Sequence, residues 1–431
     1  MRLHRSLLGA ALALFTAIAL AQTPPTTPPP TSTTQTAAEK TMTKEAKDEV
    51  LKAIADVIAN RAFVPGVDMT KWPEYIEKQK DDLDKADKDT DFSRAINRAL
   101  RDFGVSHIRL LTPRAADARD RVSVVSIGVT TRPDNNTLII TTVLPKSPAE
   151  DAGLKVGDVI TMVDGKAPEN SQVLTGDIDS QVTIKVKSGT DEKELKLKRA
   201  RVSTARPETL TWVNDDTAVI RIWTFSRGYG RENIENLMKQ ANEKAKYLIV
   251  DLRSNGGGST ANLQHFLSLL MPADTPVGTF VGKAMVRDYE KDHTPSTDPI
   301  QIASAVDRKY KTRKLTIDPF KGKIAVLVNR GSASASEICA SALHDVLGSP
   351  IVGTRSAGAV LASIFGPLPQ GFQLQYPVSD YVTVKGVRLE GHPLAPDVEV
   401  TITPTPGQAP KPTDPDPVIA KAVEKLKSAT N

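Results

Sequence analysis

Three short stretches in the second half of the chain carry residue types that could do chemistry together. In 251–258 (DLRSNGGG), glycines follow an apolar run, and their backbone N–H groups could point at a ligand because no Cβ blocks the approach. In 328–337 (VNRGSASASE), serines stand where a strand should give way to a helix. The stretch 389–398 (LEGHPLAPDV) adds a carboxylate and a histidine in a turn. A candidate nucleophile and a candidate anion site are therefore both present.

Each stretch alone has a plainer interpretation. The glycine run could be a phosphate loop, but no Gly-Lys-Ser/Thr follows it, which argues against nucleotide binding. A serine at the start of a helix is commonly just a cap. The turn at 389–398 is unremarkable by itself. The functional interpretation therefore depends on the elements that position the three stretches.

The first part of the chain, 44–120, is predicted to be an N-terminal helical region. Apolar residues recur at three-and-four spacing through Ala46–Asn60, which makes one apolar helix face. A second helix is predicted from about Asp91 to Phe103, and Gly104 ends it.

A β-rich domain is predicted at 122–201, from short runs of strand-forming residues separated by turns: 122–130, 138–143, 159–163, 181–186 and 194–197. Between them, 147–160 (SPAEDAGLKVGDVI) begins with a one-turn helix. Ser147 caps this helix, Pro148 takes its first position and Gly153 closes it.

This segment, with the turn VDGK at 163–166, closely resembles a bacterial-type PDZ domain. The resemblance implies binding of an extended peptide end by strand addition at a sheet edge. It also places the carboxylate-binding loop at Ile127, Gly128 and Val129. A small β domain without a ligand is the alternative.

From 206 onward, apolar strands alternate with helices. The predicted elements are strands at 218–223, 247–252, 324–329 and 351–353, with helices at 233–245 and 336–347. This rhythm predicts a largely parallel α/β core over 206–412. A C-terminal helix is expected within 413–431, from about Asp416 to Ser428. The predicted fold class is thus multidomain α+β.

The N-terminus has the pattern of a targeting segment. A basic start is followed by the short apolar run Leu7–Leu20 and by Ala19–Ala21, which resembles a cleavage site. A transmembrane anchor is the alternative, but the run is short for a bilayer span. We expect 1–21 to be a signal peptide, with export to the periplasm, the cell envelope or the extracellular space, and no stable membrane insertion after cleavage. The Thr/Pro-rich stretch 22–43 is expected to be a disordered tether.

The composition bears on the number of domains, on nucleic-acid binding and on disulfide bonds. The chain of 431 residues is long enough for about two or three domains. Its net charge of +5 is spread along the chain and aromatic residues make up only 5%, so a nucleic-acid interface is not expected. Cys339 is the single cysteine, which excludes an internal disulfide.

In this order, the three stretches resemble the C-terminal processing (tail-specific) serine protease family, whose motifs are DLRxNxGG, xASASE and a late G-V-x-P-D turn. The resemblance covers about 45–402. It implies an α/β peptidase core of the ββα (crotonase/ClpP-like) type that acts on polypeptide substrates at C-terminal ends, without cofactor or metal. It makes Ser334 the nucleophile and gives the oxyanion to the N–H groups of Gly257 and Ala335. Ser332 and Ser336 become structural.

One departure from the family pattern concerns the catalytic base. Many members use a lysine in T-x-G-K-G, but 353–360 reads GTRSAGAV, with Ala359 at the lysine position. A serine without a base is a poor nucleophile. The tricorn-type branch, which uses Ser, His and Glu, is similar: His107 lies in FGVSHIRL (103–110), and Glu390 precedes Asp397 by seven positions. The resemblance then implies that His107 takes the Ser334 proton and that Glu390 orients His107.

Three alternatives stay open. The chain could be a non-catalytic peptide-binding protein that kept the fold, as Ala359 suggests. A displaced lysine such as Lys385 could serve as base. A zinc site from His344 and His392 would lack any recognised spacing, so no metal is predicted. The substrate and the oligomeric state are not predicted.

Overall fold

The structure is a computed structural model that describes residues 41–401 and 416–428. The predicted signal peptide and most of the predicted tether fall outside these ranges. The prediction of a disordered tether is wrong for 41–43. Met42 is buried and donates its N–H to the Asp87 carbonyl at 2.9 Å, and Thr43 caps the first helix. No helix in the described ranges has the length and apolar character needed to cross a membrane.

The N-terminal region is mostly helical, as predicted. It contains α1 (Lys44–Asn60), η1 (Met69–Lys71), α2 (Trp72–Glu77), α3 (Lys80–Asp84), α4 (Asp89–Asp102) and α5 (Pro113–Arg121). The buried face of α1 consists of Val50, Ile54, Val57 and Ile58, which follow the helical period of the sequence.

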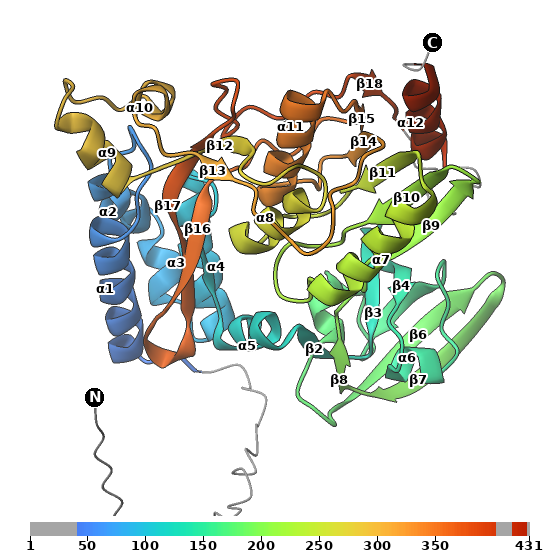
Figure 1. Ribbon diagram of the computed structural model, residues 1–431. Helices are drawn as coiled ribbons and strands as arrows, with labels where there is room; N and C mark the ends of the chain where they lie inside the picture. The colour runs from blue at the N-terminus through green and yellow to red at the C-terminus, as the bar shows by residue number, and fades with distance from the viewer. Residues whose placement is uncertain (1–40, 402–415, 429–431) are drawn as a thin grey trace, which may run out of the picture. The chain divides into compact units, whose positions relative to one another are not determined.

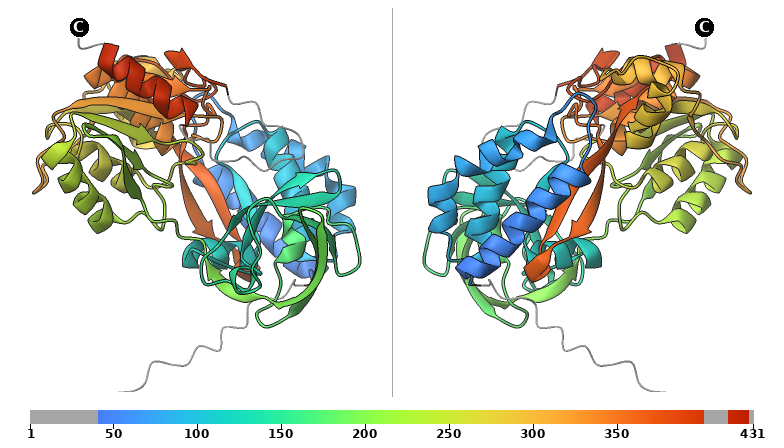
Figure 2. Two further views of the ribbon diagram at one scale, coloured as in Figure 1. Left: turned by 90° about the vertical axis from the view of Figure 1, so that its right-hand side faces the viewer. Right: turned by 90° about the vertical axis from the view of Figure 1, so that its left-hand side faces the viewer.

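This region does not form a domain of its own. Between α4 and α5, β1 (Arg109–Leu111) pairs antiparallel with β17 (Gln373–Val382), a strand from the far end of the chain. Leu374 and Phe372 are buried in the same hydrophobic cluster as α1 and α4. The hairpin of β16 (Ala362–Pro367) and β17 therefore lies beside these helices (Figures 1 and 2). The predicted boundary after 120 missed this pairing because it depends on residues distant in sequence.

The β-rich domain follows the prediction closely. Its five-stranded sheet has the order β3–β4–β5–β6–β7, from β3 (Val129–Asp134), β4 (Thr137–Val143), β5 (Val159–Val163), β6 (Gln181–Ser188) and β7 (Asp191–Lys198). A separate ladder joins β2 (Ser123–Ser126) to β8 (Ala200–Ser203). The predicted strand 122–130 is therefore two strands, which break at Ile127 and Gly128. The short helix α6 (Pro148–Asp151) has its predicted Ser147 cap.

The core is built on a six-stranded sheet of order β18–β15–β14–β11–β10–β9. Its strands are β9 (Thr209–Asn214), β10 (Thr217–Arg221), β11 (Tyr247–Asp251), β14 (Lys323–Val328), β15 (Ile351–Gly353) and β18 (Val398–Glu399). All pairs are parallel except β9 with β10, which confirms the predicted largely parallel layer.

Helices cover both faces of this sheet. Residues of α7 (Arg231–Lys244), α8 (Thr260–Ser268) and α11 (Ala335–Leu347) share one apolar cluster with alternate strand residues such as Val250 and Val326. The intervening strand residues, such as Ile249 and Leu327, pack against α12 (Pro417–Ser428) on the other face. This alternation follows the two-residue period of a strand. Both α11 and α12 lie against β14 (Figure 1).

A second, antiparallel sheet was not predicted. It has the order β1–β17–β12–β13, with β16 also paired to β17. It includes β12 (Pro276–Gly282) and β13 (Tyr310–Lys311), and α9 (Lys283–Glu290), η3 (Pro369–Gly371) and α10 (Pro299–Ala305) lie near its strands. Because β1 is one of its strands, this sheet holds the backbone next to His107.

Candidate active site

Ser334 stands at the start of α11, in a backbone conformation that is rare for a residue with a side chain. Its φ is 57° and its ψ is −121°. Such strain persists only where the surroundings enforce it, and it is common at functional sites. Here the Ser334 N–H is held by the Ala359 carbonyl at 2.8 Å and by the Glu337 carboxylate at 3.1 Å.

Glu337 is the buried hub of the nucleophile turn. One carboxylate oxygen accepts hydrogen bonds from Ser356 Oγ (2.5 Å) and Gly358 N (2.8 Å). The other accepts from Ala359 N (3.0 Å) and Ser334 N. Burial raises the pKa of Glu337, and these four donors act in the opposite direction. The segment 356–359, which resembles the lysine motif of C-terminal processing proteases, therefore holds the nucleophile turn through Ser356 Oγ and backbone N–H groups, and this contact requires no lysine side chain.

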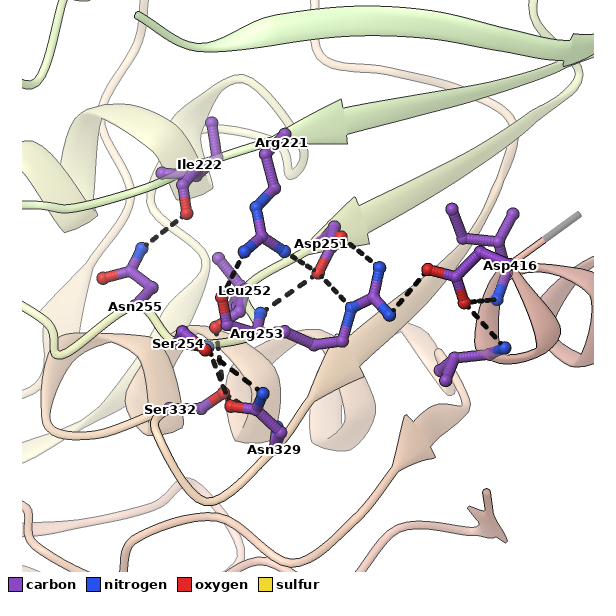
Figure 3. A network of polar contacts seen from close by, with 12 residues as sticks. Arg221, Ile222, Asp251, Leu252, Arg253, Ser254, Asn255, Asn329, Ser332 and Asp416 are labelled. Carbon is purple, nitrogen blue, oxygen red and sulfur yellow. Dashed lines mark hydrogen bonds and ion pairs between the residues drawn. The ribbon is translucent and has the colours of Figure 1, made fainter. Parts of the chain in front are cut away.

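The loop after β11 is joined to the nucleophile turn by serine hydroxyls. Ser332 Oγ donates to the Leu252 carbonyl at 2.9 Å, and Ser336 Oγ donates to the Asn255 carbonyl at 2.8 Å (Ser332 and Leu252 in Figure 3). Both serines are fully buried. The structural role predicted for Ser332 and Ser336 is thus confirmed.

The same loop is anchored at its start by a charged network. Asp251 contacts the guanidinium groups of Arg221 and Arg253, the latter at 2.7 Å (Figure 3). Arg253 also pairs with Asp416 at 2.8 Å, and Asp416 accepts the N–H of Val418 in the first turn of α12. The C-terminal helix is thereby tied to the loop that carries the glycines.

Gly257 lies directly against the nucleophile. A Cβ at this position would stand 2.7 Å from the Ser334 Cβ and 2.8 Å from the Ala335 nitrogen, and its φ is +88°. Only glycine fits here. The predicted role as a free oxyanion donor needs correction, because the Gly257 N–H already donates to Asn255 Oδ1 at 2.9 Å.

Two other N–H groups near Ser334 could hold an oxyanion. Ala335 is the first residue of α11, so its N–H has no partner within the helix. The neighbouring Gly258 lines the same pocket as Ser334, and its N–H makes no hydrogen bond within the described residues. The sequence motif did not distinguish among the three glycines, because their N–H directions depend on the folded loop.

His107 also adopts a left-handed conformation, with φ 56°. Its Nδ1 lies 2.8 Å from Ser106 Oγ. Ser106 also interacts with the Glu390 carboxylate, and that carboxylate accepts the Val360 N–H at 2.7 Å. The predicted direct contact between Glu390 and His107 is thus replaced by a bridge through Ser106, a residue that the sequence analysis did not single out.

The Ser106 bridge bears on which ring nitrogen of His107 carries the proton. If Ser106 donates to the Glu390 carboxylate, its oxygen accepts the Nδ1–H of His107, which leaves Nε2 unprotonated. Burial, together with the positive charge of Arg109, lowers the pKa of His107 to about 4. Burial raises the pKa of Glu390. His107 is therefore neutral at pH 7 and able to accept a proton.

Ser334 and His107 line one pocket of about 710 Å³, together with Gly256, Gly257 and Gly258. No hydrogen bond joins His107 to Ser334 among the described residues, but both side chains border the same space. Glu390 and Ala335 do not line it. Lys385 does not line it either and pairs with Asp345 at 3.6 Å, which argues against it as the base.

The pocket wall contains three arginines that were not predicted: Arg109, Arg119 and Arg227. They come from β1, α5 and the loop after β10. Nothing local in the sequence marks them, because arginine is common on surfaces.

Ile127, Gly128 and Val129 form the break between β2 and β3. The Ile127 carbonyl accepts the Ala149 N–H at 2.8 Å, and a Cβ at Gly128 would lie 2.2 Å from the Ser147 Cβ. The loop is thus packed against the start of α6. Leu144 N donates to the Gly128 carbonyl at 2.8 Å, so the N–H and C=O of Val129 point away from β4. They face the free edge of β3, the outer strand of the sheet.

No metal site was found: the described residues contain no group of three or more His, Cys, Asp and Glu that could hold an ion. His344 contacts Asp345 at 3.1 Å, and His392 contacts the carbonyl of Glu390 at 2.9 Å. The two histidines are thus engaged in local polar contacts.

The fold and the site together define a serine-peptidase-like α/β core that follows a PDZ-like domain. Comparison with known proteins agrees. Residues 216–400 match the model of peptidase family S41, and residues 139–188 match that of the PDZ domain. The resemblance to C-terminal processing serine proteases is therefore confirmed, with an S41 peptidase domain and a PDZ domain in this chain.

Curated relatives include proteins named "Probable CtpA-like serine protease". The Staphylococcus aureus (strain bovine RF122 / ET3-1) protein is 28% identical over 285 residues, which cover 64% of this chain and 52% of the relative. The Staphylococcus haemolyticus (strain JCSC1435) protein is 26% identical over 282 residues, with the same coverage. The chain thus spans about half the length of the curated relatives it matches.

Among solved structures, mature CPAF complexed with lactacystin aligns with a TM-score of 0.51 at 14% identity. The alignment covers 89% of this chain and 97% of that chain. At this identity the match shows a shared fold only.

Proposed function

We propose that this protein is an exported serine endopeptidase that cleaves polypeptides near their C-termini through an acyl-enzyme on Ser334. The observation that carries the proposal is the shared pocket of Ser334 and His107, with His107 linked through Ser106 to Glu390. A nucleophile, a base and an orienting acid are the three groups that such catalysis needs.

In the proposed reaction, Ser334 Oγ attacks the substrate carbonyl carbon while His107 Nε2 takes the hydroxyl proton. Glu390, acting through Ser106, stabilises the imidazolium that forms. The oxyanion is held by the Ala335 N–H and a glycine N–H, each commonly worth about 3 kcal/mol. The N-terminus of α11 adds a favourable dipole. His107 then protonates the leaving amine, and water hydrolyses the ester by the reverse roles.

Substrate recruitment by the PDZ domain is part of the proposal. It is supported by the outward N–H and C=O of Val129 on the free edge of β3, where a peptide could add as a further strand. Export is supported by the basic start and the short apolar run of the first residues. N-terminal sequencing of the protein recovered from the cell envelope or medium tests export, since an intact N-terminus would contradict it.

Labelling with a fluorophosphonate probe tests the catalytic proposal. We expect the wild-type protein to be labelled and both Ser334→Ala and His107→Ala to lose the label. Ser304→Ala, an exposed serine on α10, serves as the control and should label like the wild type. Labelling that persists in His107→Ala would contradict the proposed base.

A non-catalytic peptide-binding protein is the second candidate. Two observations favour it: Ala359 in place of the family lysine, and the Gly257 N–H already engaged by Asn255. This candidate predicts binding of C-terminal peptides with no labelling of the wild type, so the same experiment separates the two.

A further inference from the structure

The pocket that contains Ser334 and His107 is strongly positive on one wall. Arg109, Arg119 and Arg227 line it, and no Asp or Glu of the described residues does. Guanidinium groups in a cleft of one charge sign attract anionic ligands and raise their local concentration. The three arginines therefore favour a ligand that carries negative charge.

One carboxylate, that of Asp120, contacts both Arg119 and Arg227. Asp120 Oδ1 lies 2.6 Å from Arg119 and 3.5 Å from Arg227. The Asp120 main-chain carbonyl also accepts from Arg227 at 2.8 Å. The positive charge of the pair is thus only partly balanced.

Arg109 has no acidic partner in the described part of the chain. Its Nε donates to Gln375 Oε1 at 2.8 Å, which is a neutral acceptor. Arg109 is exposed at the pocket wall, and partial desolvation there, with the positive charge of Arg119, lowers its pKa. An incoming anion would relieve this repulsion.

Arg109 and Arg119 are held in place before any ligand arrives. Arg109 belongs to β1 and stands opposite Gln375 of β17 in the ladder. The Arg119 guanidinium lies 3.6 Å from the centre of the Phe365 ring. A held guanidinium loses little conformational freedom on binding, so its fork can pair with a carboxylate at low entropic cost.

We propose that Arg109, with Arg119 beside it, forms a subsite for a substrate carboxylate next to the scissile bond. The subsite rests on the proposed peptidase function for its place in a reaction, although binding itself does not require turnover. The carboxylate could come from an acidic side chain or from a free C-terminus. Both present the planar pair of oxygens that a guanidinium binds through two hydrogen bonds.

The subsite would also assist His107. The charge of Arg109 disfavours the imidazolium form of His107. A carboxylate bound to Arg109 offsets that charge, so His107 becomes a stronger base when such a substrate is present. Substrate choice and catalysis are thereby linked through one arginine.

The test uses the full-length Ser334→Ala protein and short fluorescein-labelled peptides, with binding measured by anisotropy at low salt. One peptide carries an internal Glu and an amidated end. A second carries Gln at that place and a free C-terminus. A third, with Gln and an amidated end, has no carboxylate. We expect a carboxylate peptide to bind about tenfold or more tightly than the third, and the source that gives this advantage identifies the natural group.

Adding Arg109→Gln should abolish the advantage, because Gln keeps a hydrogen-bonding group but no charge. Arg109→Lys should restore part of it. Arg61→Ala, an exposed arginine at the end of α1 that does not line the pocket, is the matched control and should leave it unchanged. A carboxylate held only by the PDZ loop would keep its advantage in Arg109→Gln, and that result overturns the proposal.

Equal affinities for all three peptides would also overturn it. The binding result can be distinguished from a failure of the proposed peptidase function. If the wild-type protein cleaves no peptide while the Arg109-dependent advantage is present, the peptidase proposal fails and the carboxylate subsite stands.

Discussion

The hydroxyl of Ser106 lies 2.8 Å from Nδ1 of His107, and the same side chain interacts with the Glu390 carboxylate. The acid of the proposed triad therefore reaches the histidine through a serine. When Ser106 donates to Glu390, the proton of neutral His107 lies on Nδ1 and Nε2 is the basic nitrogen.

Ser106→Ala should lower kcat about 10- to 100-fold with a smaller change in KM, by analogy with the loss of a group that orients a metal-bound histidine. The loss leaves both Nδ1 and Glu390 without their shared partner. Steady-state kinetics on a fluorogenic peptide measure it, and Ser106→Thr, which keeps a hydroxyl, should recover part of the rate. An unchanged kcat in Ser106→Ala would show that Glu390 does not act through this bridge.

Gly257→Ala should displace the nucleophile. The new Cβ would meet the Ser334 Cβ at 2.7 Å, and the φ of +88° adds about 1 kcal/mol of strain. We expect loss of fluorophosphonate labelling by about 100-fold or more. Gly189→Ala is the matched control, since its φ is +64° but nothing lies within 4 Å of the added carbon. Equal labelling of the two variants would contradict the close contact.

Glu337→Gln should destabilise the fold by about 2–4 kcal/mol, measured by urea denaturation. Each carboxylate oxygen accepts two hydrogen bonds, and an amide nitrogen in place of either oxygen would face two donors. Labelling should fall as well, because the Ser334 turn loses its clamp. Glu424→Gln, at an exposed pair with Lys421, should cost less than about 1 kcal/mol. A similarly small loss of unfolding free energy in Glu337→Gln would contradict a stabilising role for the four hydrogen bonds to Glu337.

The pH dependence of kcat/KM should reflect the lowered pKa of His107. Because the base must be neutral, activity on an uncharged peptide should be lost as pH falls through about 4 and be level up to neutral pH. In Arg109→Gln the acidic limb should move to higher pH, since one cause of the lowered pKa is removed. A limb that stays in place, or moves lower, would contradict the assigned influence of Arg109.

Several parts of the fold could be predicted because their signals are local. The helix α1, the cap at Ser147 and the strands around the site depend on periodicity and capping within a few residues. The β1–β17 pairing could not be predicted in this way. Leu110 stands opposite Leu374 in the ladder, and no local pattern joins residues so far apart in sequence.

The sequence by itself determined the nucleophile turn and its immediate frame. Gly257 lies in a local glycine run, and Ser334 lies in a serine-rich run where a strand gives way to a helix, so neighbouring residues are enough to mark both positions. The tertiary structure alone decided how the remaining groups meet. It placed Ser106 between His107 and Glu390 and gathered three arginines around the pocket. These relations depend on strands and loops that are distant in the chain and adjacent only after folding, because packing rather than local propensity sets their distances.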